Sequence, residues 1–319
     1  MTSSAAGHLM APLGAGSAVF AFDVGGTDTK AALVDDAGSI REIVRVPTPI
    51  DGKRTAAAVV TRIGDLAGDL LRNHPDVHPL AAGLLVPGYV DDQDGVGVFS
   101  ENLGWSNYPF RERAEAMLGM PVSFSHDVRG AGEAEFRLGA AAPFRDVVVM
   151  SIGTGIAGAI FLQGALYTGG GMAGEMGHSK VADNPQCACG GWGCLEAVAS
   201  AGAIARRYAH ATGQIVSGAK DVLDRAVRGD VPASEIWESA LDALALDLSH
   251  TIALLAPEAI VIGGGLSQAG AALFDPLEQR LEAILTFQRR PKLLRASIGE
   301  NAGVIGAALR ARDLVIEAS

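Results

Sequence analysis

Residues 175–196 read EMGHSKVADNPQCACGGWGCLE, and this stretch holds every cysteine of the 319-residue chain: Cys187, Cys189 and Cys194. Glycines between them let the backbone turn tightly enough to bring three thiolates together. With His178 they make three sulfurs and one imidazole nitrogen, the donor set of a closed tetrahedral zinc site. Three buried thiols, or a disulfide with one cysteine left over, is the alternative, but an odd number crowded into a short span favours a metal. No ligand position is left for a catalytic water, so the sequence predicts a structural zinc ion.

Two acids, Glu175 and Glu196, flank the cysteines at the ends of this stretch, which we call the zinc loop. Acids in a loop ordinarily form a solvated face, and that is the alternative here. Two carboxylates fixed by one metal site nevertheless indicate a function. The sequence therefore predicts that the zinc holds Glu175 and Glu196 rigidly in a binding site.

The composition limits the classes of protein to consider. The chain is long enough for two domains with a large core, and 49% of its residues are hydrophobic but only 5% aromatic. A net charge of −11 and a pI near 5.1 argue against a nucleic-acid partner, which would require a basic surface. The clustered cysteines, and the lack of any lysine or arginine before Lys30, predict a cytoplasmic protein without a secretory signal. The uncharged stretch 147–174 is interrupted by glycines, so it predicts two short strands and no membrane helix.

One pattern occurs twice in the chain: a buried strand, a glycine turn and a second strand. It covers residues 18–35, with the turn at 25–27, and again residues 147–162, with the turn at 153–155. The repeat predicts an internally duplicated α/β fold with a cleft between its halves. Further strands are expected at 40–46, 80–86, 122–125 and 259–262. Helices are expected at 55–72, 106–118, 195–211, 222–227, 234–255, 269–285 and 303–315.

The glycine turns are candidate phosphate loops. Glycines let backbone N–H groups approach a phosphate, a threonine adds a hydroxyl donor, and a carboxylate such as Asp23 could hold Mg²⁺ directly or through water. An ordinary hairpin turn explains one such loop about as well, but three after buried strands favour a nucleotide site. None matches a P-loop or a dinucleotide fingerprint. The loop residues are Asp23, Gly25, Gly26, Thr27; Gly153, Thr154, Gly155; and Gly263, Gly264, Gly265.

Two further residues are candidates for contact with a substrate. Asp127 follows the strand at 122–125 and precedes a helical stretch, so its carboxylate could accept a proton from a hydroxyl. On spacing alone, a helix N-cap is the better explanation. Asn102 lies in the segment ENLGW at 101–105, whose amide, carboxylate and indole suit recognition of a polyol. The alternative is a loop in which Trp105 is simply packed.

With these motifs together, the chain resembles the ROK family of sugar kinases, repressors and open reading frames, within the sugar kinase, heat-shock and actin superfamily. The likeness covers residues 19–314, and its most specific parts are GEMGH at 174–178 and CACGGWGCLE at 187–196. It implies a general base at Asp127, ATP phosphates on the loops at 23–27 and 153–155, and adenosine beside residues 263–265. It also implies Mg²⁺ with the ATP and His178 as both a zinc ligand and a sugar ligand. The residues implied to hydrogen-bond the sugar hydroxyls are Asn102, Asp127, Glu175, His178 and Glu196.

The resemblance also implies an architecture of two actin-like, ribonuclease H-like ATPase domains. The expected domains are 18–125 completed by the helix 303–319, and 126–302 with the zinc loop, while residues 1–17 are expected to be disordered and too few for a DNA-binding domain. A homodimer is a further implication of the family.

Two positions depart from the family pattern. The family commonly has asparagine before the catalytic aspartate, where this chain has His126, and lysine or asparagine after the phosphate-loop threonine, where this chain has Asp28. A carboxylate at Asp28 is unfavourable beside phosphates unless it points away or meets Mg²⁺. Neither change removes Asp127 or a zinc ligand.

The sequence and the resemblance together predict an ATP-dependent hexose kinase, a glucokinase acting on the sugar 6-hydroxyl. The alternatives are a kinase for mannose, fructose, allose, N-acetylglucosamine or N-acetylmannosamine, and a glucokinase that uses polyphosphate. A sugar sensor without catalysis is a further alternative, which the retained Asp127 disfavours.

Overall fold

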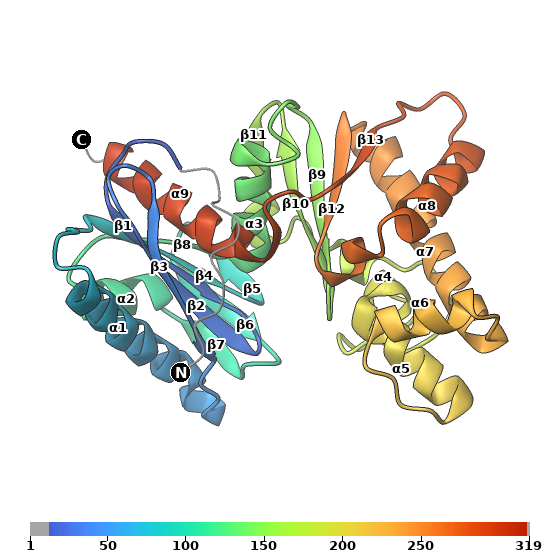
Figure 1. Cartoon of the computed structure of the whole chain (residues 1–319), viewed down its shortest axis with the longest axis horizontal. Coiled ribbons are helices and arrows are strands. Elements are labelled where there is room, and N and C mark those ends of the chain that lie inside the picture. Colours follow the sequence, from blue (N-terminus) through green and yellow to red (C-terminus); the bar gives the residue numbers. More distant parts are fainter. Residues whose placement is uncertain (1–12, 318–319) are drawn as a thin grey trace. The chain divides into compact units, whose positions relative to one another are not determined.

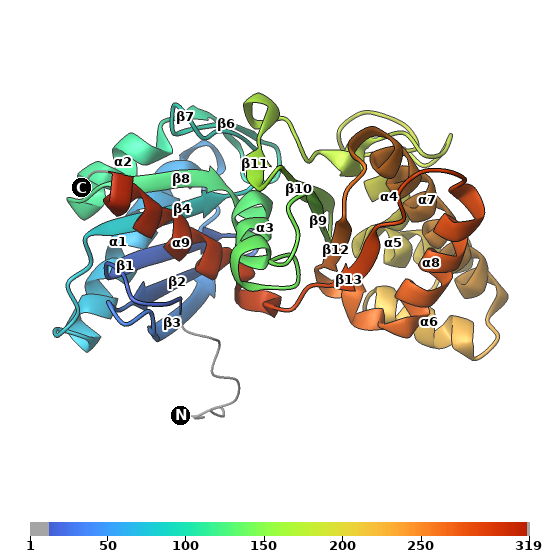
Figure 2. The same ribbon diagram turned by 90° about the horizontal axis from the view of Figure 1, so that it is seen from above.

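The computed structural model describes residues 13–317, which divide into two compact units (Figures 1 and 2). Unit 1 consists of the described residues up to Ala134 together with those from Asn301 onwards, and unit 2 is Glu135–Glu300. Each unit is an α/β body with one five-stranded sheet. The sequence placed the division at residues 125 and 302, whereas the first division falls inside a helix, α3 (Asp127–Leu138).

The sheet of unit 1 has the strand order β3-β2-β1-β4-β8. Its strands are β1 (Val19–Val24), β2 (Asp28–Val34), β3 (Ile40–Pro47), β4 (Ala81–Val86) and β8 (Val122–His126). The first three run antiparallel, and β4 and β8 then continue parallel to β1. A small antiparallel sheet adds β5 (Tyr89–Asp91), β6 (Val96–Ser100) and β7 (Trp105–Tyr108).

Helices cover both faces of the unit 1 sheet because the side chains of β1 alternate between two apolar layers. Phe20 and Phe22 pack with α1 (Thr55–Asn73) and α2 (Phe110–Leu118), whereas Val19 and Ala21 pack with α9 (Ala302–Glu317). In Figure 1, α9 (red) lies beside the first strands (blue), although the two come from opposite ends of the sequence.

Glycines set how closely α9 approaches the rest of unit 1. A Cβ on Gly83 of β4 would lie 2.0 Å from the carbonyl oxygen of Ala307, and one on Gly306 would lie 1.9 Å from that of Gly130. The helix backbone therefore packs directly on β4 and α3, with no side chain between them.

Unit 2 repeats the sheet topology in the order β11-β10-β9-β12-β13. Its strands are β9 (Val147–Ile152), β10 (Ile156–Leu162), β11 (Ala165–Tyr167), β12 (Ala259–Gly263) and β13 (Lys292–Arg295). One face of the sheet packs on helices α4 (Leu195–Ala199), α5 (Ala201–Thr212), α6 (Ala219–Val227), α7 (Val231–Leu255) and α8 (Ala271–Ile284). On the other face Phe161 stacks against Phe136 of α3, with ring centroids 4.1 Å apart.

The predicted duplication and the α/β class are confirmed, because β1-β2-β4 and β9-β10-β12 have the same pairing and direction. Several predicted boundaries are wrong. The helix expected from residue 106 begins at Phe110, since residues 105–108 pair in β7. The helix expected at 195–211 is two helices, because Ser200 is extended and caps α5. A 3₁₀ turn, Gly265–Ala269, precedes α8.

Residues 13–17, assigned by the sequence to a disordered terminus, hydrogen-bond to unit 1. The Leu13 and Gly16 amides donate to the carbonyls of Gly38 and Asp36, and Arg312 donates to the Ser17 carbonyl. The rest of that predicted segment, residues 1–12, lies outside the described residues. Within residues 13–317, no helix is both long and apolar enough to span a membrane.

Candidate functional site

The zinc loop brings its four predicted ligands together. The ligand atoms of His178, Cys187, Cys189 and Cys194 all lie within 4.8 Å of one another. Cys189 and Cys194 Sγ are 3.7 Å apart, and Cys187 Sγ is 3.8 Å from His178 Nδ1. Tetrahedral zinc with Zn–S bonds of ~2.3 Å requires a sulfur–sulfur distance of about 3.8 Å. The four side chains could thus hold a zinc ion with little rearrangement.

The surroundings of two of the cysteines disfavour the thiolate form, which a bound cation would stabilise. Burial raises the pKa of Cys187, and it raises the pKa of Cys194 to about 12. Hydrogen bonding from the Gly191 backbone instead lowers the pKa of Cys189. Coordination to a metal removes the thiol proton outright, so a bound ion would offset the burial that disfavours the thiolates of Cys187 and Cys194.

The carboxylates that flank the zinc loop have different surroundings. Glu196, in the first turn of α4, accepts a hydrogen bond from the Ile156 amide at 2.9 Å, directly after the glycine loop 153–155. Glu175 Oε2 lies 4.0 Å from His178 Nε2, the ring nitrogen opposite the one that faces Cys187. A carboxylate in that place can orient a metal-bound imidazole.

Asp247 of α7 anchors the segment that carries His178, and the sequence analysis missed it. Its carboxyl is 3% exposed and hydrogen-bonds the hydroxyl of Ser179, the residue after His178. That hydroxyl also lies 2.9 Å from the Met176 carbonyl. A hydroxyl has one proton, so if Ser179 donates it to Met176, Asp247 must be the donor and therefore a neutral acid. Burial raises the pKa of Asp247, while the hydrogen bond with Ser179 and the charge of His250 oppose that shift.

We expect Asp247→Asn to remove a pH-dependent loss of stability. The raised folded-state pKa means that the stability contributed by Asp247 is complete below the unfolded-state value of 3.8 and is lost as the pH rises through the folded-state pKa. The amide cannot ionise, so the free energy of unfolding of Asp247→Asn should exceed that of the wild type by a growing amount as the pH rises above 3.8. Denaturant unfolding at one pH near 3.8 and at one near neutrality measures the difference. Asp247→Ala, which removes the bond to Ser179, should cost ~1–3 kcal/mol at either pH. Parallel wild-type and Asn curves would show that Asp247 is ionised in the folded protein.

In unit 1, Asp23 is the penultimate residue of β1, just before the first glycine loop. Burial raises the pKa of Asp23 to about 7, with a smaller contribution from the negative charge of Asp127 and an opposing one from Lys30. A Cβ on Gly303 would lie 2.3 Å from Asp23 Oδ2, so the carboxylate rests against the first turn of α9. A divalent cation beside this carboxylate would favour its ionised form.

The loop after Asp23 leaves room for a ligand. Gly26 has an ordinary negative φ and open space around its Cβ position, so the folded chain itself does not require glycine there. The loop is tied down by bonds of Gly25 N–H to the Asp28 carbonyl and of Thr48 to the carbonyls of Gly25 and Thr27. The Asp28 carboxylate pairs with Arg45 of β3 at 2.6 Å, which compensates the charge that departs from the family pattern.

Asp127 is the first residue of α3, directly after β8. Its Oδ1 accepts a hydrogen bond from the Val128 amide at 2.7 Å and lies 3.3 Å from His126 Nδ1, which accepts from the same amide at 3.2 Å. The imidazole is buried, while a quarter of the Asp127 side chain is exposed. Asp127 therefore does bind the backbone at a helix start, as the capping alternative requires, yet keeps a second oxygen free of any hydrogen bond to residues 13–317.

A buried network, also missed from the sequence, fixes the junction of β8 and α3. Asp92 accepts a hydrogen bond from Ser125 and pairs with Arg129, both at 2.7 Å. Arg129 is 1% exposed. Ser125 and Arg129 lie two positions before and two positions after Asp127. The network therefore sets the direction of the helix turn that carries Asp127. No sequence signal links residues 92 and 129.

The other candidates lie in two more loops. Asn102 is exposed in the turn between β6 and β7, whereas Trp105 is 3% exposed and packs edge-on against Phe110, so the packing alternative holds for the tryptophan. The third glycine loop follows β12. There Gly264 has φ +76°, and a Cβ would lie 2.4 Å from the Ile152 carbonyl oxygen, so this glycine is needed for the fold itself.

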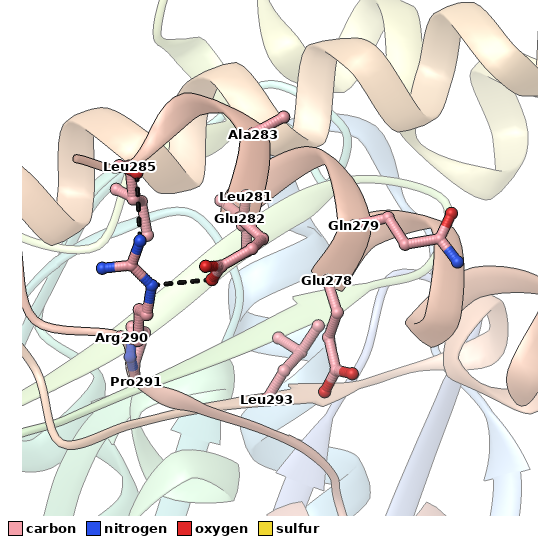
Figure 3. Close-up of a pocket in the computed structure, with 9 residues that line it drawn as sticks. All are labelled: Glu278, Gln279, Leu281, Glu282, Ala283, Leu285, Arg290, Pro291 and Leu293. Atoms are coloured by element: carbon pink, nitrogen blue, oxygen red, sulfur yellow. Dashed lines mark hydrogen bonds and ion pairs between the residues drawn. The ribbon is translucent and has the colours of Figure 1, made fainter.

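A hollow of about 640 Å³ on unit 2 contains none of the predicted site residues. Leu281 of α8, Leu285 just after that helix and Leu293 of β13 line it, and an Arg290–Glu282 ion pair of 2.7 Å borders it (Figure 3). Its position beside an edge strand separates it from the loops described above.

Comparison with known proteins identifies the family of the chain. The ROK family profile matches residues 19–313. A glucokinase of Halalkalibacterium halodurans is 34% identical over 304 residues, covering 89% of this chain and 92% of that protein. The crystal structure of a ROK hexokinase from Thermus thermophilus superposes with a TM-score of 0.82 at 30% identity, covering 95% of this chain and 100% of that one. A ROK family glucokinase from Streptomyces griseus, in complex with glucose and AMPPNP, has a TM-score of 0.78 at 30% identity, covering 93% and 100%. The chain belongs to the ROK family.

Proposed function

We propose that the protein is an ATP-dependent hexose kinase, a glucokinase that transfers the γ-phosphoryl group of ATP to the 6-hydroxyl of glucose. Membership of the ROK family supports a sugar kinase, and the glucokinases and the ROK hexokinase that the chain matches support glucose as acceptor. The observation that carries the catalytic part is Asp127, a partly exposed carboxylate held at the start of α3 by one oxygen only.

In this proposal Asp127 accepts the proton of the attacking hydroxyl. The Val128 N–H and the Asp92–Arg129 network orient the carboxylate, which contributes typically ~10²–10⁴-fold to the rate. Asn102, Glu175, His178 and Glu196 would hydrogen-bond the sugar hydroxyls. Positioning of the two substrates supplies much of the remaining acceleration.

The donor would lie on the glycine loops. Backbone amides of residues 25–27 and 153–155 would receive its phosphates, the hydroxyls of Thr27 and Thr154 would add donors, and residues 263–265 would border the adenosine. Asp23 would hold Mg²⁺, which neutralises phosphate charge when bound. The buried, acidic surroundings of Asp23 fit a cation.

We further propose that His178, Cys187, Cys189 and Cys194 hold a structural zinc ion. Three sulfurs and one nitrogen within 4.8 Å support this assignment. A homodimer and a cytoplasmic location are the remaining parts of the proposal, and light scattering of the purified protein tests the first.

We expect ADP release with Mg·ATP to be fastest with glucose in a panel that also contains mannose, fructose, allose, N-acetylglucosamine and N-acetylmannosamine. A second arm replaces ATP by polyphosphate and follows formation of the sugar phosphate, because this reaction releases no ADP. Faster turnover of another sugar would reassign the acceptor, and turnover with polyphosphate alone would reassign the donor. Binding of sugar without turnover in either arm would replace the kinase by a sugar sensor.

A further inference from the structure

The loop Gly153-Thr154-Gly155, between β9 and β10, exposes hydrogen-bond donors that the protein does not use. Gly153 N–H bonds within the loop, to the Gly155 carbonyl at 2.9 Å, and the Gly153 carbonyl accepts from Ala201 of α5. The amides of Thr154 and Gly155 and the Thr154 hydroxyl have no hydrogen-bond partner anywhere in residues 13–317. Gly153 has open space at its Cβ position. The loop thus has three donors without a partner in residues 13–317, on an exposed Thr154 and a half-buried Gly155 beside the Glu196 carboxylate.

A cation from α5 lies next to this loop. A Cβ on Gly202 would be 2.9 Å from Arg206 Nη1 and 3.1 Å from the Thr154 carbonyl oxygen. Arg206 is four residues after Gly202, so its side chain runs back along the helix toward its first turn. The glycine leaves the space that the guanidinium occupies, beside the loop.

Within residues 13–317, no acid forms an ion pair with Arg206. Its side chain is exposed and makes no hydrogen bond with any of the described residues. The adjacent Arg207 is different: it donates to the Val198 carbonyl at 2.8 Å and to Ser239 Oγ at 2.7 Å, and is a structural residue. The acid bound to the loop, Glu196, is engaged with the Ile156 amide. A guanidinium over the first turn of a helix is also opposed by the partial positive charge of that end.

These observations favour an anion between Arg206 and the loop. Backbone amides, a hydroxyl and a guanidinium are the donors that proteins use for phosphate, and the guanidinium binds it through a fork of N–H groups. We propose that Arg206 binds the phosphate chain of the phosphoryl donor on the loop at residues 153–155. This inference rests on the proposed kinase function and adds to it a donor-binding residue.

The test compares Arg206→Ala, Arg206→Lys and the matched control Arg228→Ala. Arg228 directly follows α6 in the same unit, and its exposed side chain has no hydrogen bond or ion pair within the described residues. Isothermal titration with Mg·ATP, with adenosine and with tripolyphosphate is done first, because equilibrium binding needs no turnover. Steady-state kinetics with glucose then give KM for each substrate.

We expect Arg206→Ala to weaken Mg·ATP binding and to raise KM for Mg·ATP about tenfold, with Arg206→Lys intermediate and Arg228→Ala unchanged. Adenosine affinity and KM for glucose should stay as in the wild type, because neither ligand carries a phosphate. Added salt should reduce the difference between wild type and Arg206→Ala. Loss of tripolyphosphate binding alone, with Mg·ATP unaffected, would assign the site to an inorganic polyphosphate donor.

Mg·ATP and tripolyphosphate affinities of Arg206→Ala both within twofold of the wild type would overturn the inference, as would an equal loss of adenosine affinity. Failure of the kinase proposal has a different signature. In that case the wild type phosphorylates none of the sugars, whereas the titrations still decide whether Arg206 contacts a phosphate chain.

Discussion

Replacing Asp127 with alanine should lower kcat for glucose phosphorylation by ~10²–10⁴-fold, the range of a general base. The variant should still bind glucose, with weakened affinity, because one of several sugar ligands is lost. KM for Mg·ATP should change little. Steady-state kinetics and equilibrium binding of glucose separate these effects, since removal of a group that acts in the transition state lowers kcat more than it raises KM.

Asp127→Asn and Asp65→Asn complete this experiment. The amide keeps the size of Asp127 and the hydrogen bond from Val128, but it cannot take a proton, so its kcat should fall as far as that of the alanine variant. Asp65 is an exposed acid on α1 whose side chain has no hydrogen bond or ion pair in the described part of the chain, and its amide variant should match the wild type. Turnover of Asp127→Asn within a few-fold of the wild type would mean that another group accepts the proton.

Removal of the zinc should have the second large effect. Cys194→Ser, or treatment with a chelator, should lower the melting temperature by ~10 °C or more. A structural zinc ion contributes several kcal/mol to folding, and each kcal/mol shifts the melting temperature by ~2–4 °C in a chain of this size. Sugar affinity should fall too, because the loop between Glu175 and Glu196 loses its constraint. Differential scanning calorimetry and glucose titration measure the two effects.

Metal analysis is the decisive control for this prediction. The purified wild type should contain about one zinc per chain, and Trp192→Ala, an exposed side chain of the same loop, should keep it. Acid should release the metal, since the ligands must be deprotonated to bind. Protein that is free of zinc yet melts at the same temperature as the untreated sample would exclude a structural role for the metal.

The sequence was most informative where chemistry is concentrated within a few residues. The four metal ligands span only residues 178–194, so composition and spacing sufficed to predict their cluster. The duplicated hairpins were predictable for the same reason, because each is a local strand, turn and strand.

Residues that meet through packing were not predictable. Asp92 meets Arg129 across 37 positions, and Asp247 meets Ser179 across 68. Arg206 is only four residues from Gly202, but its place beside Thr154 depends on how α5 abuts the loop after β9. The sheet of β5, β6 and β7 was not predicted, because its strands are short. The sequence also offered Trp105 as part of a binding site, whereas its side chain belongs to the core.

The position of α9 has a consequence for synthesis on the ribosome. Unit 2 is one continuous segment, whereas unit 1 has Val19 and Ala21 of its central strand packed on Val304 and Ala307. The nascent N-terminal segment therefore cannot bury that face of its sheet until α9 has left the exit tunnel. Unit 2 can complete its core earlier, which reverses the usual N-to-C order of domain folding. Until α9 emerges, the exposed face of β1 and β4 is a surface on which chaperones can act.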